Sequence, residues 1–243
     1  MSRPTSELAI AVLLPDVLGT YGDVGNATIL AQRARWRGIP ARVQLVTAQT
    51  PPPTTCDIYL LGGGEDTAQL FAADWLARNR PLITALGTSA ITLAVCAGLQ
   101  ILGRSMADQQ GRVSAGLGLL DLVTAPLPTR AVGEVVSTCT VPGVDVLTGF
   151  ENHMGRTTLG PGTYPLGQVR TGTGNGAPDA AGVAGEGALT DRIVGTYMHG
   201  PALARNPSLA DYILHRATGL ALAPIELPDQ TALRHQYLKT AAR

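Results

Sequence analysis

The sequence predicts an α/β fold with a mostly parallel central sheet flanked by helices and with a β-rich second half. Short apolar runs, typical of strands buried on both faces, alternate with helical segments through residue 105. From residue 116 to residue 194 the chain is rich in Gly and in β-prone residues. Because strands that alternate with helices form parallel sheets, we expect the first half of the chain to build the central sheet.

The elements expected in the first half follow one another closely. Residues 8–14 are a continuous apolar run that Pro15 ends, and residues 91–95 are another such run that leads directly into a helical stretch. Further strands are expected at residues 41–46 and 57–61, and helices at residues 27–37, at residues 67–78 and starting within residues 81–86.

In the second half, candidate strands are residues 134–141, 144–147 and 168–171, and a strand-like run follows at residues 192–198. A helix over residues 206–218 is expected near the C-terminus, with Pro207 at its first helical position. No shift in composition marks a domain boundary, so we predict a single domain over residues 1–243.

The composition excludes several classes of protein. Eighteen basic and 18 acidic residues give no net charge, so there is no positive field to attract nucleic acid or an anionic membrane. Charged residues make up only 15% of the chain, against about 25% in typical domains, which favours a surface partly covered by a partner. No apolar run reaches the roughly 18 residues of a transmembrane segment, so we expect none.

The cysteines, the histidines and the single lysine indicate which compartment and which kinds of binding site to expect. Cys56, Cys96 and Cys139 form no CxxC pair and are odd in number, which favours a reducing cytoplasm. No Cys or His spacing matches a zinc site, so we predict no metal. Lys239 is the only lysine, so the P-loop motif GxxxxGK[ST] is absent and ATP binding by that route is not expected.

The strongest chemical signal surrounds Cys96. A buried strand leads into this residue, a helix follows at once, and Ala94, Ala97 and Gly98 are all small. A tight strand-to-helix turn that presents a nucleophile tolerates only such neighbours. The helix N-terminus favours a thiolate, and the N–H of Ala97 can face an oxyanion. The alternative, a buried and inert Cys, is less consistent with this context.

A loop of three glycines and four histidines supply the other candidate groups. Residues 62–64 end a strand at the sheet edge expected for Cys96, where the N–H of Gly63 can complete an oxyanion hole, although a simple tight turn is the alternative. A thiol nucleophile needs a base. His199 at a strand end and His153 are rival candidates that spacing does not separate, whereas two further histidines are expected to be structural or solvated: His215 and His235.

Several segments resemble the motifs of one enzyme family. CAGLQ at residues 96–100 resembles the C-x-G-x-Q nucleophile motif of class I glutamine amidotransferases, and the three glycines resemble their oxyanion loop. GFENHMG at residues 149–155 and YMHG at residues 197–200 are similar to the cobyric acid synthase-like branch. With YGDVGN at residues 21–26 and GGGED at residues 62–66, they resemble more narrowly the glutaminase subunit of lipid II isoglutaminyl synthase.

This resemblance implies roles for five residues. Cys96 would be the nucleophile that forms a thioester with glutamine, and His199 would be the base. Arg130 would hold the α-carboxylate of glutamine, for which a planar guanidinium is suited, with a solvated surface Arg as the alternative. The N–H groups of Gly63 and Ala97 would hold the oxyanion.

The resemblance also implies a partner. The chain would form a heterodimer with a Mur-ligase-like synthetase subunit, which carries ATP and Mg²⁺ and uses the ammonia to amidate the D-glutamate of the lipid II stem peptide. This chain would need no cofactor of its own. Two alternatives stay open: a cobyric acid synthase-type amidotransferase for a corrinoid carboxylate, and a non-catalytic subunit that stabilises a partner.

Two features remain open at this point. Many class I amidotransferases have a Glu two residues after the catalytic His, but Pro201 occupies that place here. Either a Cys–His dyad operates or another acid substitutes, with Glu151 and Asp191 as unranked candidates. The basic run RARWR at residues 33–37 predicts a solvated helix face, with a contact to a partner or to an anionic substrate as the alternative.

Overall fold

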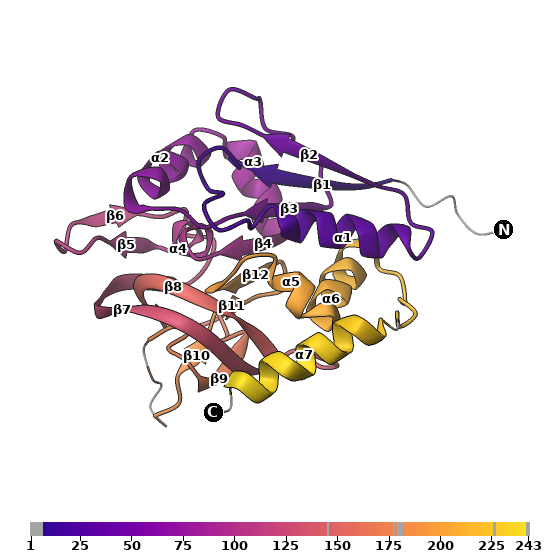
Figure 1. The fold of residues 1–243 in the computed structure, drawn as a ribbon. Helices are drawn as coiled ribbons and strands as arrows, with labels where there is room; N and C mark the ends of the chain where they lie inside the picture. The colour runs from indigo at the N-terminus through magenta and orange to yellow at the C-terminus, as the bar shows by residue number, and fades with distance from the viewer. Residues whose placement is uncertain (1–6, 145, 177, 179–181, 226, 242–243) are drawn as a thin grey trace.

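The computed structural model describes residues 7–241 apart from residues 145, 177, 179–181 and 226, and a central sheet dominates its first half (Figure 1). Within these residues the sheet has the strand order β11-β12-β4-β3-β1-β2. In chain order its strands are β1 (Leu8–Leu13), β2 (Ala41–Val46), β3 (Ile58–Leu61), β4 (Ile91–Val95), β11 (Ala188–Leu189) and β12 (Ile193–Thr196). All neighbouring pairs are parallel except β11 with β12, so the expected fold class is confirmed.

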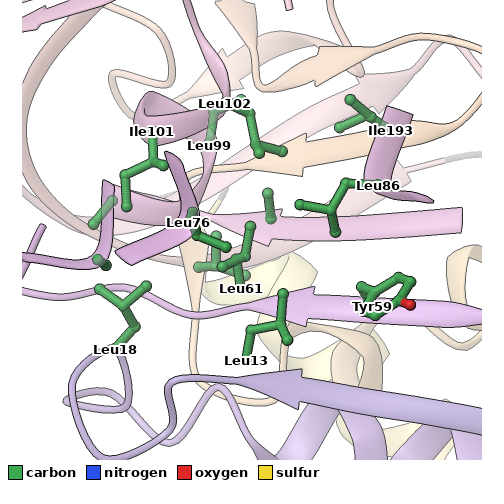
Figure 2. Close-up of a cluster of buried hydrophobic side chains, with 14 of the residues drawn as sticks. Leu13, Leu18, Tyr59, Leu61, Leu76, Leu86, Leu99, Ile101, Leu102 and Ile193 are labelled. Carbon is green, nitrogen blue, oxygen red and sulfur yellow. The ribbon is translucent and has the colours of Figure 1, made fainter. Parts of the chain in front are cut away.

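The strands β1, β3 and β4 are buried on both faces of the sheet, which explains why they are continuous apolar runs, whereas the edge strand β2 alternates and is partly exposed. Successive side chains of β1 enter different hydrophobic clusters, with Ile10 on one face and Leu13 on the other. Figure 2 shows the cluster around Leu13, which contains Leu61 from β3 and residues from helices, among them Leu76 and Leu99.

Helices cover the two faces. The face of Ile10 is covered by α1 (Gly25–Arg35), α5 (Ala202–Arg205) and α6 (Pro207–Thr218). The face of Leu13 is covered by α2 (Asp66–Ala77), α3 (Arg80–Thr84), the π-helical turn Ala85–Ser89 and α4 (Ala97–Leu102). Pro207 is the first residue of α6, as predicted, because a proline needs no hydrogen-bond acceptor at that position.

The β-rich second half forms a second sheet. Its longest strands are β7 (Leu122–Cys139) and β8 (Val146–Leu159), which are antiparallel and whose register shifts between Pro126 and Ala131. Its other strands are β5 (Ser105–Ala107), β6 (Val113–Ala115), β9 (Gly167–Thr171), β10 (Gly185–Glu186) and β13 (Met198–His199). Because β12 pairs with β4 and β13 pairs with β8, the segment from β12 to β13 connects the two sheets.

The sequence missed part of this second half. The strands expected at residues 134–141 and 144–147 overlap the much longer β7 and β8, and residue 145 lies outside the described residues. The first part of β7 was missed because prolines at its irregularity interrupt the apolar pattern without ending the strand. The helix α7 (Pro228–Ala241), which carries His235 and contacts β7, was not predicted. None of the helices in the described part of the chain is both long and apolar enough to cross a bilayer.

The basic run at residues 33–37 was predicted incorrectly. Arg33 is only 3% exposed, and its guanidinium makes two hydrogen bonds of 2.7 Å to the Asp211 carboxylate on α6. Arg37 donates to the same carboxylate. The run therefore joins α1 to α6, and this buried ion pair explains two of its cations without a partner protein.

Candidate active site

Cys96 occupies a tight turn between β4 and α4. Its backbone has φ +50° and ψ −105°, a conformation that L residues with side chains rarely adopt, and its N–H donates to the Thr196 carbonyl of β12 over 2.8 Å. A methyl group on Gly98 would lie 2.7 Å from the Leu61 side chain and 2.8 Å from its carbonyl oxygen. The small neighbours predicted for this turn are therefore required by the packing of α4 against β3.

His199 lies in β13, at the junction of the two sheets. The residue is 4% exposed, and its Nδ1 lies 3.7 Å from Oδ2 of Asp23. Tyr21 packs against the imidazole with the ring centroids 4.2 Å apart. On another side, a methyl group on Gly63 would come within 2.5 Å of the ring, so the loop of three glycines lies directly against the imidazole.

The surroundings of His199 determine its charge. Burial alone would lower the pKa of the imidazole, but the Asp23 carboxylate and the Cys96 sulfur outweigh this effect and raise the pKa to about 9. The imidazole is therefore protonated at neutral pH. The positive charge of the imidazolium therefore lies beside the Cys96 sulfur, the atom expected to attack an acyl group.

Asp23 is the residue of this site that the sequence analysis missed. It belongs to the segment between β1 and α1, it is 3% exposed, and its Oδ2 accepts the N–H of Gly63 over 2.8 Å. The only signal in the sequence was its place in YGDVGN, which served as a family marker and carried no indication of which side chain it would face. The fold brings this carboxylate to the Nδ1 side of His199.

The two acids considered from the sequence lie elsewhere. Glu151 accepts the N–H groups of Thr173 and Gly174 and lies 3.5 Å from Nε2 of His153. The side chain of Asp191 is 96% exposed and faces Arg216. Asp23 is therefore the acid whose position matches that of a group orienting His199.

The glycine loop differs in detail from the expectation. The N–H of Gly63, predicted to hold an oxyanion, donates to Asp23 in this structure. Gly64 is the glycine of the loop that lines the cavity next to Cys96. Ala97 is the first residue of α4, where helical N–H groups have no partner within the helix, so its predicted role is compatible with the geometry.

A cavity of about 150 Å³ adjoins Cys96. Arg130, at the register shift of β7, lines this cavity and donates to Oδ1 of Asn152 over 3.0 Å. Gln100 also lines it and is held by buried hydrogen bonds to Gln69 and Tyr197. The structure thus brings Cys96 and Arg130 to one cavity, and Tyr21, which also lines it, packs against His199.

His153, the rival base, has a different setting. Its ring stacks on Tyr197 with a centroid distance of 3.9 Å, and its Nδ1 lies 3.0 Å from the Gly155 carbonyl, to which the N–H donates. His215 lies exposed on α6, and His235 lies on α7. In the ranges that the structure describes, no cluster of three or more His, Cys, Asp or Glu residues is arranged to hold a metal ion.

Comparisons with known proteins identify the family to which the chain belongs. Residues 9–207 match the model of the CobB/CobQ-like glutamine amidotransferase domain. The chain belongs to this glutamine amidotransferase family. Two solved structures have the same fold: a glutamine amidotransferase (TM-score 0.55, 17% identity, covering 87% of this chain and 99% of that one) and the glutaminase domain of Trypanosoma brucei CTPS with bound acivicin (TM-score 0.53, 10% identity, covering 92% and 98%).

Curated relatives of this amidotransferase include proteins with two different names. Lipid II isoglutaminyl synthase (glutamine-hydrolyzing) subunit GatD of Staphylococcus aureus is 35% identical, over 94% of this chain and 93% of that protein. The protein of the same name from Streptococcus pneumoniae is 34% identical, over 84% and 78%. Cobyric acid synthase of Cereibacter sphaeroides is 32% identical over 82% of this chain, which spans only 39% of that protein.

Proposed function

We propose that this chain is the glutaminase subunit of a lipid II isoglutaminyl synthase. In this proposal it hydrolyses L-glutamine and supplies ammonia to a Mur-ligase-like synthetase subunit, which binds ATP and Mg²⁺ and amidates the D-glutamate of the lipid II stem peptide. The match to the two subunits with this name extends over most of both chains, which supports the assignment over the much longer cobyric acid synthases.

The observation that carries the chemistry is the grouping of His199 with the Asp23 carboxylate and with the sulfur of Cys96, the residue that lines the cavity. In the first step the Cys96 sulfur attacks the carboxamide carbon of glutamine, and a C–S bond forms while the carbonyl oxygen gains negative charge. The N–H of Ala97 and an N–H of the glycine loop, at Gly64, stabilise that oxygen.

The imidazolium of His199 then gives its proton to the leaving nitrogen, so that the C–N bond breaks and ammonia departs from a thioester. The neutral imidazole next takes a proton from water, whose oxygen attacks the thioester carbon. The C–S bond breaks, glutamate leaves, and the thiolate and the imidazolium are restored. Asp23 holds the ring in position and stabilises its positive charge, as an acid does beside a catalytic His.

The experiment is to measure glutamate release from L-glutamine by the purified chain, alone and with its synthetase subunit. The variants Cys96→Ala and His199→Ala are measured beside it. We expect both variants to be inactive and, with ATP, Mg²⁺ and lipid II present, the complete enzyme to form amidated lipid II. No glutamate from the wild type in either preparation would favour a non-catalytic subunit instead, and amidation of a corrinoid carboxylate but not of lipid II would favour the cobyric acid synthase alternative.

A further inference from the structure

Two opposite charges line the cavity beside Cys96 without being paired. Glu65 and Arg130 both face this cavity, and neither takes part in an ion pair with any of the described residues. Glu65 occupies the residue before α2, yet its carboxylate makes no capping hydrogen bond to that helix. Its charge is therefore available to a ligand in the cavity.

A row of hydrogen bonds connects the two charges, and we call its four residues, Glu65, Tyr21, Asn152 and Arg130, the polar bridge. The Tyr21 hydroxyl donates to Glu65 over 3.5 Å, the amide of Asn152 donates to the Tyr21 oxygen over 3.2 Å, and Arg130 donates to the other end of Asn152 over 3.0 Å. Burial and the Glu65 carboxylate raise the pKa of Tyr21 while Arg130 lowers it, so both charges act on this hydroxyl.

The other charged groups of the cavity are engaged elsewhere. The carboxylate of Asp108 accepts from Nε of Arg112 over 2.6 Å and from two backbone N–H groups, so these two side chains neutralise each other. Asp66 is the first residue of α2, where a carboxylate interacts favourably with the helix dipole. The contact of 3.5 Å between Tyr21 and Glu65 is at the limit of a hydrogen bond, so Glu65 keeps most of its capacity to accept.

We infer that Glu65 binds the α-ammonium group of L-glutamine, opposite Arg130 on the α-carboxylate. This inference rests on the proposed glutaminase function and adds the selectivity of the site. A short alkyl chain separates the α-carbon of glutamine from the carboxamide that Cys96 must reach, so both α-substituents have to be bound at the rim of the same cavity. A carboxylate and a guanidinium held at the two ends of the polar bridge complement a zwitterion, and an amide without the ammonium group leaves Glu65 unpaired.

The test compares L-glutamine with glutaramate, which is glutamine without its α-amino group, by the ammonia released from each. We expect the wild type to have a kcat/KM for L-glutamine at least about tenfold above that for glutaramate, the cost of losing a charged hydrogen bond. In Glu65→Gln this preference is expected to disappear, mainly through a higher KM for L-glutamine. The rate with glutaramate is expected to stay at its wild-type value, which also shows that the variant is folded.

Asp66→Asn is the matched control, because it removes the same charge from the next residue of the same wall. It is expected to keep the preference for L-glutamine. Arg130→Gln is expected to slow both substrates, since both carry the carboxylate. A preference that survives in Glu65→Gln, or that Asp66→Asn removes equally, would overturn the inference while the proposed function stands. A wild type that releases no ammonia from L-glutamine, alone or with its synthetase subunit, would overturn both.

Discussion

Two buried histidines of this protein have similar neighbours and differ in what those neighbours are free to do. His199 lies 3.7 Å from the carboxylate of Asp23, and His153 lies 3.5 Å from that of Glu151. Each imidazole also packs against a tyrosine ring. A buried histidine beside a carboxylate and an aromatic ring is therefore not sufficient to define a catalytic base.

The first difference between the two histidines is how the neighbouring carboxylate is hydrogen-bonded. Glu151 accepts two backbone N–H groups, from Thr173 at 2.6 Å and from Gly174 at 2.8 Å, and so it holds a turn of the chain. Asp23 accepts a single N–H, from Gly63, and its Oδ1 has no hydrogen-bond partner in the ranges that the structure covers. The first carboxylate is used by the scaffold, whereas the second keeps the capacity to stabilise an imidazolium.

The second difference is the nucleophile. Cys96 acts on His199 and helps to raise its pKa to about 9. His153 instead donates to the Gly155 carbonyl of the same strand, β8, and stacks on Tyr197, which lies between β12 and β13. We call the residues around the first histidine the His199 cluster: Cys96, His199, Asp23 and Tyr21. We call those around the second the His153 cluster: His153, Glu151, Tyr197 and Glu186.

The comparison is tested most strongly by replacing each histidine in turn. His199→Ala removes the proposed acid and base and is expected to lower kcat for glutamate release by about 10²- to 10⁴-fold. His153→Phe keeps a ring against Tyr197 and is expected to keep kcat close to wild type while losing about 1 kcal/mol of stability with its hydrogen bond. Steady-state kinetics and chemical denaturation measure the two effects. A larger loss of kcat in His153→Phe than in His199→Ala would show that His153, not His199, is the acid and base.

Replacing each acid by its amide gives the next largest effect. Asp23→Asn removes the charge beside the imidazolium and is expected to lower kcat/KM about 10- to 100-fold. It should also move the alkaline limb of the pH profile to lower pH, since the carboxylate raises the pKa of His199. Glu151→Gln is the matched control and should leave that limb where it is. An unchanged profile in Asp23→Asn would remove this residue from the mechanism.

A buried carboxyl of the His153 cluster is expected to cost stability. Glu186 is fully buried, and burial raises its pKa from 4.5 to about 7, with further help from Glu151. The folded state therefore holds a proton that the unfolded state releases, so this group favours folding below pH 4.5 and loses that contribution as the pH rises to about 7. Glu186→Gln is expected to be more stable than the wild type at pH 8 by about 1–3 kcal/mol and to show no such gain at pH 4.

Urea denaturation at the two pH values measures this difference. The Oε1 atom of Glu186 accepts from Thr196 and from the N–H of Tyr197, which the amide oxygen of Gln can still do. A loss of stability in Glu186→Gln at pH 8 would show that the charged carboxylate supports the second sheet after all.

The smallest expected effect is the pH dependence of the wild type. The pKa of His199 is raised from 6.5 to about 9, so its protonated form persists through neutral pH and is lost as the pH rises through about 9. The imidazolium is the proposed proton donor to ammonia, so kcat should fall about tenfold for each pH unit above that value. The same protonation favours the folded state, fully below pH 6.5 and no longer above about pH 9. An alkaline limb of the kcat profile near pH 6.5 would show that Asp23 and Cys96 do not raise the pKa of the His199 imidazole.

Local signals account for what could be predicted. The apolar runs of β1, β3 and β4 predicted a parallel sheet because burial on both faces leaves no place for polar residues. Small residues around Cys96 predicted its turn, because a tight strand-to-helix turn tolerates only small neighbours. The structure adds that a side chain at Gly98 would collide with Leu61 of β3. Both the apolar runs and the small residues are local patterns in the sequence, so they can be recognised without the structure.

Other signals depended on distant residues and were misinterpreted or missed. The basic run at residues 33–37 has the pattern of a solvated face, yet Asp211 on α6 makes it a buried ion pair. The long strands β7 and β8 were predicted only as fragments, since their pairing with each other sustains them through prolines and glycines. In both cases the residues that pair with the segment are distant in the sequence, so the local hydrophobic pattern does not reveal them.

By itself, the sequence determined the fold class, the turn that carries Cys96 and the two histidines between which the base had to be chosen. Only the tertiary structure distinguishes the surroundings of His199 from those of His153, because the difference depends on which of them lies beside Cys96 and beside a carboxylate with an unpartnered oxygen. The same holds for Asp23, whose position is set by the packing of the segment after β1 against the glycine loop and β13. Hydrophobic patterns act over a few residues, whereas a catalytic geometry is assembled from segments that meet only when the sheets are formed.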